Sequence, residues 1–204
     1  MPRTISTKPD YSVRWWRRHG YEPPERDVFA ILENEVEYRF FTPPPEGRGQ
    51  VLQGDARTAS RLFPGLVEKV KLVIASPPYL DTTNFAEDQW LRLWFLGGPE
   101  RPLNIRADDR HTSAAHYWKF LQEAWAGIRD LLRPDARLII RIGGARLALD
   151  EIAQGLVSSL EEGLRRSLSL EEQRRSEISG GQVRSFQART RDARFEYDFH
   201  FHLR

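Results

Sequence analysis

The residues best suited to chemistry form one tetrapeptide, Ser76-Pro77-Pro78-Tyr79, which directly follows an apolar run at 70–75. The two prolines fix φ and have no backbone N–H, so this segment is stiff, extended and rich in hydrogen-bond acceptors. Those acceptors are the Ser76 hydroxyl and the backbone carbonyls, and Tyr79 adds a flat ring beside them. An acceptor cluster next to an aromatic ring suits a planar ligand that carries an amino group.

The elements that position this tetrapeptide alternate between strand and helix patterns. The run at 70–75 is short, contains Val and Ile and ends at proline, which predicts a buried strand. We expect further strands at 50–53 and 137–142, and helices at 56–62, 85–96, 113–132 and 149–165. This alternation predicts an α/β fold with a mostly parallel sheet.

The end of the chain has the clearest strand pattern. Large apolar residues alternate with polar ones from Phe195 to Arg204, which places the apolar side chains on one face of a strand. Its expected partner is the segment 168–178. The chain is therefore predicted to end in an antiparallel strand pair at the edge of the sheet.

Composition excludes several classes of protein. The chain has 204 residues, no cysteine, and 31 Lys and Arg against 29 Asp and Glu. Disulfides, thiolate metal sites and a cysteine nucleophile are therefore excluded. No stretch is apolar for long enough to span a bilayer, and the first residues do not resemble a signal peptide. We expect a soluble, cytoplasmic protein with no membrane partner.

Residues 1–49 differ from the rest and are predicted to form a basic, aromatic arm followed by a helix at 24–41. The arm combines arginines such as Arg14 and Arg17 with Trp15, Trp16 and Tyr21. Arginine with aromatic rings is typical of a nucleic-acid surface. The alternative is that the tryptophans pack on the body of the domain.

Three segments together carry a resemblance to a known family. They are Ser76-Pro77-Pro78-Tyr79, the upstream pair Gly54-Asp55, and the segment 132–140. Together they resemble the amino-group DNA methyltransferases, which act on cytosine N4 or adenine N6, and specifically their C-terminal portion. The resemblance covers residues 50–204 and implies a partial Rossmann-like fold dependent on S-adenosylmethionine. The serine form of the tetrapeptide is more similar to the cytosine-N4 enzymes.

The resemblance also implies roles for individual residues. Ser76 and the Pro77 carbonyl would accept the two N–H groups of the target amine, and Tyr79 would stack on a base flipped out of DNA. Pro78 completes the catalytic tetrapeptide. Gly54 and Asp55 would bind S-adenosylmethionine, with Asp55 accepting from its adenine amino group. The alternative for Asp55 is an ordinary turn or helix cap.

Part of the family's cofactor site has no counterpart in this sequence. The glycine-rich loop Phe-x-Gly-x-Gly is not found, and the domain at 50–204 is expected to lack the first two strands. A second subunit or a homo-oligomer could supply the loop, since an uncovered sheet edge invites pairing. A truncated reading frame, or a non-catalytic nucleic-acid-binding or assembly protein, stays open as an alternative. A different substrate, RNA or a protein glutamine, fits the serine less well.

No metal site is expected. His200 and His202 lie on one face of the predicted C-terminal strand and could clamp a metal ion. A solvent-facing pair on an amphipathic strand is the interpretation we favour.

Overall fold

The computed structural model describes most of the chain. The described residues are 9–22, 24–43, 46–47, 49–80, 90–101, 113–143, 147–177 and 195–204. Their helices are α1 (Pro9–Arg18), α2 (Val28–Phe40), α3 (Ala59–Leu62), α5 (Trp90–Phe95), α6 (Ala114–Ile128) and α7 (Leu149–Leu164), with short 3-10 helices η1 (Ala56–Thr58), η2 (Pro64–Leu66) and η4 (Arg129–Leu131). Their strands are β1 (Val70–Ala75), β2 (Leu132–Gly143), β3 (Leu168–Glu177) and β4 (Phe195–Leu203).

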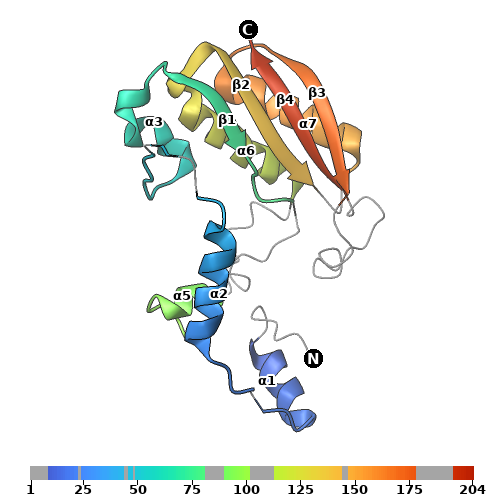
Figure 1. The fold of residues 1–204 in the computed structure, drawn as a ribbon. Coiled ribbons are helices and arrows are strands. Elements are labelled where there is room, and N and C mark those ends of the chain that lie inside the picture. Colours follow the sequence, from blue (N-terminus) through green and yellow to red (C-terminus); the bar gives the residue numbers. More distant parts are fainter. Residues whose placement is uncertain are drawn as a thin grey trace.

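These strands form one mixed sheet in the order β1-β2-β4-β3 (Figure 1). β1 runs parallel to β2, whereas β4 runs antiparallel to both β2 and β3. The predicted α/β class and the C-terminal antiparallel pair are confirmed, but the prediction of a mostly parallel sheet is wrong, because this sheet is mostly antiparallel. The physical reason lies at 50–53. That segment, predicted as a strand, does not form one, so β1 has no parallel neighbour on its outer side among the described residues.

β2 begins earlier than its predicted start at residue 137. Val70 pairs with Leu132 and Leu72 pairs with Arg137, so β2 has an irregular stretch between these pairs. Pro134 lies in that stretch, where a residue without an N–H removes no ladder hydrogen bond. The register is then regular as far as Ala75 opposite Ile140, which brings the carboxyl ends of β1 and β2 together.

Helices α6 and α7 cover one face of the sheet and enclose the core (Figure 1). The apolar half of the β4 alternation is buried there, as its period of two predicts. The core also includes Leu138, Ile140 and Ile142 of β2, Tyr117 and Leu121 of α6, and Ile152, Leu156 and Leu160 of α7. A Cβ at Gly155 of α7 would overlap the Trp118 ring, so glycine lets α7 and α6 approach closely.

The other face of the sheet bears no helix among the described residues (Figure 1). On β3 and β4 that face carries ion pairs, whereas two large aliphatic side chains of β1 are exposed, Leu72 at 49% and Ile74 at 73%. Exposed aliphatic side chains on an edge strand are typical of a surface that another element covers.

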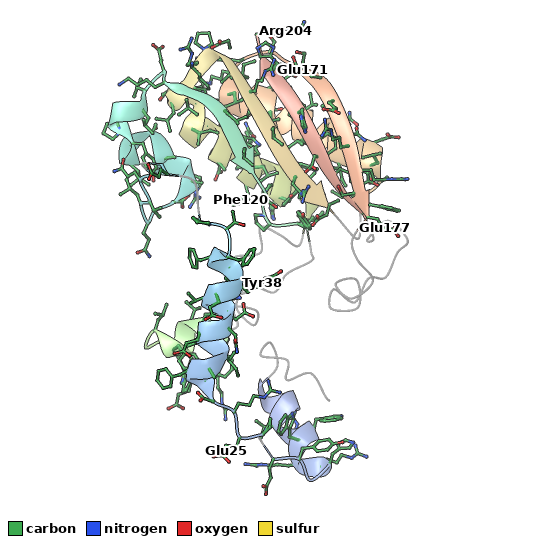
Figure 2. The ribbon with its side chains drawn as sticks, viewed as in Figure 1. Glu25, Tyr38, Phe120, Glu171, Glu177 and Arg204 are labelled. Carbon is green, nitrogen blue, oxygen red and sulfur yellow. The ribbon has the colours of Figure 1, made fainter. Side chains whose placement is uncertain are left out.

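Helices α1 and α2 form an arm that extends away from the sheet (Figure 1). The predicted helix at 24–41 is confirmed, although it begins at Val28, where the Asp27 carboxylate accepts from the Ala30 N–H at 3.0 Å. Figure 2 shows Tyr38 projecting outward from α2, with 81% of its surface exposed. The division into 1–49 and 50–204 stays a prediction. No described helix is long and apolar enough to cross a membrane.

Candidate functional site

The tetrapeptide Ser76-Pro77-Pro78-Tyr79 follows β1 directly as irregular chain. It therefore lies at the carboxyl ends of the only parallel strand pair among the described strands. Ser76 and Pro78 are exposed, whereas Pro77 and Tyr79 are half-buried. Ser76 is thus accessible to a ligand, although its side chain also hydrogen-bonds to that of Tyr79, and the Tyr79 ring is partly held by the protein.

Two residues at the end of the β2–β4 pair hold the Tyr79 ring. The Tyr79 hydroxyl donates a 2.8 Å hydrogen bond to Glu196 Oε1, on β4. A Cβ at Gly143, the last residue of β2, would come within 2.9 Å of the Tyr79 ring. Gly143 and Glu196 face each other in the β2–β4 register. The sheet therefore fixes both the position of the ring and the direction of its hydroxyl.

Glu196 is in turn part of an ion-pair network. Arg141 donates from Nε and Nη2 to the two carboxylate oxygens of Asp198, both at 2.7 Å. Its Nη1 lies 3.7 Å from Glu196 Oε2. Arg141 also keeps the pKa of the Asp198 carboxyl below its ordinary value, mainly through these hydrogen bonds. The carboxylate that accepts from Tyr79 is thus flanked by a fixed positive charge.

Sequence reasoning did not connect Gly143, Arg141 or Glu196 with the tetrapeptide. Glu196 belongs to the polar half of the C-terminal alternation, where it looks like any solvent-facing residue. Its role depends on the pairing of β4 with β2, and it is 117 residues from Tyr79 in sequence. The strand alternation was the available signal, but it does not give the register.

The environment of Tyr79 raises the pKa of its phenol above the ordinary tyrosine value. Burial is the largest cause, followed by the hydrogen bond to Glu196 and the negative charge of that residue. A hydrogen bond with the Ser76 side chain and the charge of Arg141 act in the opposite direction. Burial also raises the pKa of Tyr117 in the core. Both phenols therefore stay protonated at neutral and moderately alkaline pH.

An alkaline titration followed by tyrosinate absorbance tests this arrangement. Tyr79 and Tyr117 are expected to ionise in a late phase, well above about pH 10. Tyr79→Phe should remove amplitude from this late phase. Loss of early amplitude in Tyr79→Phe would contradict the burial of this phenol.

The sign of the linked stability effect follows from the direction of these shifts. Because the native pKa of Tyr79 lies above its unfolded value, the associated stability is fully present below the unfolded pKa. That stability is lost as the pH rises through the native pKa. Alkaline unfolding of the parent chain should accordingly accompany the late phase of the titration.

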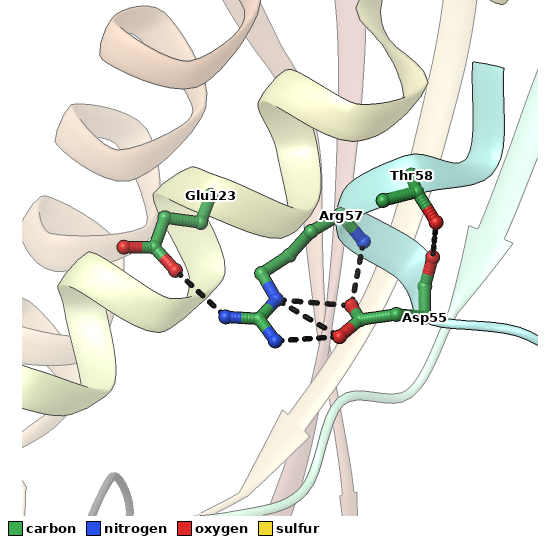
Figure 3. Close-up of polar contacts among 4 residues, drawn as sticks. All are labelled: Asp55, Arg57, Thr58 and Glu123. Atoms are coloured by element: carbon green, nitrogen blue, oxygen red, sulfur yellow. Dashed lines mark hydrogen bonds and ion pairs between the residues drawn. The ribbon is translucent and has the colours of Figure 1, made fainter. Parts of the chain in front are cut away.

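The carboxylate of Asp55 caps η1 (Figure 3). The carboxylate accepts from the Arg57 backbone N–H at 2.9 Å and from Arg57 Nε at 3.0 Å. The Thr58 hydroxyl donates to the backbone carbonyl of Asp55 at 3.0 Å. The Arg57 guanidinium continues to Glu123 of α6, at 3.4 Å. The helix-capping interpretation of Asp55 is confirmed, and its cofactor-binding role stays a prediction.

Gly54 is explained by close packing. A Cβ there would overlap Leu62 Cδ1, so Leu62 of α3 covers this glycine. A second close approach lies at Gly127 of α6, where a Cβ would overlap the Ala56 carbonyl oxygen. These contacts fix the turn that carries Asp55 against α6. A cofactor-binding role for Gly54 stays a prediction.

The described residues do not form a complete site for S-adenosylmethionine. Both carboxylate oxygens of Asp55 already accept from Arg57, which leaves the carboxylate little capacity for an adenine amino group. Two shallow hollows lie between α6 and α7, both lined by Lys119, Gln122 and Glu162, and neither is lined by a residue of the tetrapeptide.

The described residues also contain no group of three His, Asp or Glu side chains placed to hold a metal ion. His200 Nδ1 lies 3.6 Å from Glu172, and His202 Nδ1 lies 3.3 Å from Glu171, both on the neighbouring strand β3. Each histidine thus has a carboxylate partner across the sheet.

Comparison with known proteins gives structural similarities at low identity. No protein-family model matches the sequence, and no curated protein matches it. A protein named as a DNA modification methylase of Thermus thermophilus is 17% identical, with a TM-score of 0.40 over 73% of this chain and 50% of that one. The M1.HpyAVI–SAM complex is 14% identical, with a TM-score of 0.40 over 76% of this chain and 53% of the other.

A third similar structure is SMU.776, a protein named as a methyltransferase and complexed with SAH. It is 9% identical, with a TM-score of 0.34 over 97% of this chain and 37% of that one. The chain thus partly resembles DNA modification methylases and other methyltransferases in structure, and it spans about half the length of the first two.

Proposed function

We propose that this chain is the base-handling half of a DNA methyltransferase that modifies an exocyclic amino group, with cytosine N4 favoured over adenine N6. The observation that carries the proposal is the placement of Ser76-Pro77-Pro78-Tyr79. The tetrapeptide follows a parallel strand pair at its carboxyl ends, and the Tyr79 ring is fixed by Gly143 and Glu196.

The proposed chemistry needs orientation and no covalent intermediate. An exocyclic amine conjugated to a base is a poor nucleophile. Acceptance of its two N–H groups by Ser76 Oγ and the Pro77 carbonyl would make the nitrogen more tetrahedral and would direct its lone pair toward a methyl donor. The Tyr79 ring would stack on the flipped base, and its hydroxyl would keep the ring aligned through Glu196.

The methyl donor in this proposal is S-adenosylmethionine, held mainly by a second chain. One observation supports a second chain: the outer edge of β1 is unpaired among the described strands. Leu72 and Ile74 are exposed on that strand. An added strand would satisfy the edge and bury these side chains. In this proposal Asp55 would contact S-adenosylmethionine where the second chain meets this one.

Titration calorimetry with S-adenosylmethionine tests the division of the site. The isolated chain is expected to give no saturable heat, and saturable binding is expected once a second gene product that carries the glycine-rich loop is added. The same mixture should transfer methyl groups to DNA cytosine. The proposal would be contradicted if neither S-adenosylmethionine binding nor methyl transfer to DNA is seen when the products of all neighbouring genes are added.

A non-catalytic nucleic-acid-binding protein built on half of this fold is the second candidate. The observation that favours it is the set of exposed arginines on α1, which lies away from the tetrapeptide (Figure 1). Tight binding of S-adenosylmethionine by the isolated chain would exclude this second candidate.

A further inference from the structure

Helix α1 carries three arginines on one face. Arg14, Arg17 and Arg18 have the spacing i, i+3 and i+4, which places them on one side of a helix within about 6 Å along its axis. All three side chains are exposed. None has an ion-pair partner among the side chains that the structure describes, which in α1 begin at Val13.

Aromatic rings occupy the opposite face and pack on one another. The Trp15 ring stacks on His19, with centroids 4.1 Å apart, and on Tyr21 at 5.5 Å. The Trp16 ring meets the edge of Tyr21 at 6.2 Å. Gly20, with φ at +64°, makes the turn that returns Tyr21 to the helix, where its N–H donates to the Trp16 carbonyl at 3.0 Å.

This ring cluster stabilises a helix of ten residues, a length that is marginal for an isolated helix in water. Because Trp15 stacks on both His19 and Tyr21, part of its ring surface is covered, and Trp15 and Trp16 are half-buried. The cluster thus gives a rigid base from which the three guanidinium groups project together into solvent.

We propose that the arginine face of α1, made of Arg14, Arg17 and Arg18, binds the phosphate backbone of duplex DNA at a site separate from the Ser76–Tyr79 tetrapeptide. Guanidinium groups donate two parallel hydrogen bonds to phosphate and keep their charge at any physiological pH. Three of them on one face neutralise neighbouring phosphates without reading the bases.

Two competing ligands fit the geometry less well. Single-stranded nucleic acid is bound largely by stacking of bases on exposed rings, and here the Trp15 and Trp16 rings are half-buried in the cluster. A membrane-surface helix inserts its apolar face between lipids, whereas on that face of α1 the Trp15 ring is stacked on His19 and Tyr21 and is half-buried.

The charge differs on the next helix of the arm, where Arg39 pairs with Glu35. This helix, α2, exposes three glutamates, Glu33, Glu35 and Glu37. The arm therefore offers one localised cationic face rather than a diffuse positive charge. This inference goes beyond the proposed function, because backbone binding by α1 requires no methyl transfer, and only the choice of DNA over RNA rests on that function.

Fluorescence anisotropy of the full chain with a labelled DNA duplex of mixed sequence tests the inference. The triple variant Arg14→Ala/Arg17→Ala/Arg18→Ala is expected to bind at least about tenfold more weakly at low salt. The slope of log K against log salt should become shallower by up to about 2.7, because each phosphate contact contributes about 0.9. A triple arginine-to-lysine variant should keep the parent slope, which separates charge loss from misfolding.

A matched control removes three exposed positive charges from the α/β body, namely Arg61, Lys71 and Arg137. We expect its affinity for the duplex to stay within about threefold of the parent value, which is roughly the effect of one phosphate contact. Equal weakening of both triple variants, or unchanged binding by the α1 variant, would overturn the inference.

Further binding measurements distinguish duplex DNA from other ligands that carry phosphate groups. Tighter arginine-dependent binding to a single strand of the same length, to an RNA duplex, or to vesicles of anionic phospholipid would each overturn the assignment to duplex DNA. The assay contains no methyl donor. Methyl transfer is measured separately, in the assay of the proposed function. Arginine-dependent duplex binding with no methyl transfer in that assay would count against the proposed function alone. Methyl transfer with no arginine-dependent duplex binding would count against this inference alone.

Discussion

Replacing Tyr79 by alanine is expected to reduce methyl transfer about a hundredfold or more in any active preparation, while the fold survives. The ring would stack on the target base, and base–ring stacking contributes about 1–3 kcal/mol per base. Loss of alignment at the reacting nitrogen adds to this, because a displacement of about 1 Å can cost about a hundredfold in rate. Ser76→Ala should have a similar effect, since it removes one acceptor of the amine.

Initial rates of transfer to DNA, measured with radiolabelled S-adenosylmethionine, give the comparison. Tyr38→Ala is the matched control, because Tyr38 is an exposed tyrosine on α2 and should leave the rate unchanged. Parent-like activity in both Ser76→Ala and Tyr79→Ala would remove the basis for the proposed function.

Tyr79→Phe separates the contribution of the ring from that of the hydroxyl. The variant keeps the ring against Gly143 but loses the hydrogen bond to Glu196, which is left with Arg141 as its partner. We expect activity reduced no more than about tenfold, because a hydrogen bond to a charged group contributes about 1.5–3 kcal/mol and only part of that acts on ring alignment.

How far the site could be predicted depends on the range of each signal. The tetrapeptide is local: an apolar run, two prolines and an aromatic residue are visible together in the sequence. The groups that hold Tyr79 come from strand ends that are distant in sequence. Their contact follows from the register Gly143 opposite Glu196, which depends on tertiary pairing.

The same distinction explains the fold. The C-terminal strand was predictable because its alternation continues over its whole length and one face is buried. The strand expected at 50–53 has no such pattern, and it lacks a described strand that could pair with it. A short segment that has neither a long apolar run nor a neighbouring strand gains too little stability from pairing to form a strand. The prediction of a mostly parallel sheet, which relied on this segment, was therefore wrong.

Asp55 shows why a motif residue needs its surroundings before it is given a role. The pair Gly54-Asp55 is shared with a family in which the resemblance implies cofactor binding, yet the local geometry uses the carboxylate to cap η1 and to hold Arg57. Both uses fit the same sequence. Only the contacts of Arg57 with Asp55 and Glu123 distinguish the structural one.

Phe199→Ala is expected to be the most destabilising single change on the sheet, lowering the free energy of unfolding by about 3–5 kcal/mol. Phe199 is fully buried at the centre of β4, where it stacks on Phe201 at 6.3 Å and lies under α6 and α7. Truncation leaves a cavity that the covered face cannot close. Such a loss is a large share of the roughly 5–15 kcal/mol typical of a domain.

Urea unfolding followed by tryptophan fluorescence measures the change, and His200→Ala is the matched control on the same strand. His200 points to the opposite face and is paired with Glu172 at 3.6 Å, with 25% of its side chain exposed. A partly exposed contact of this kind contributes about 0–1 kcal/mol, so the midpoint of His200→Ala should stay near that of the parent chain. Equal losses in the two variants would mean that the face opposite α6 and α7 is covered as well, which is the arrangement expected if a second chain completes the sheet.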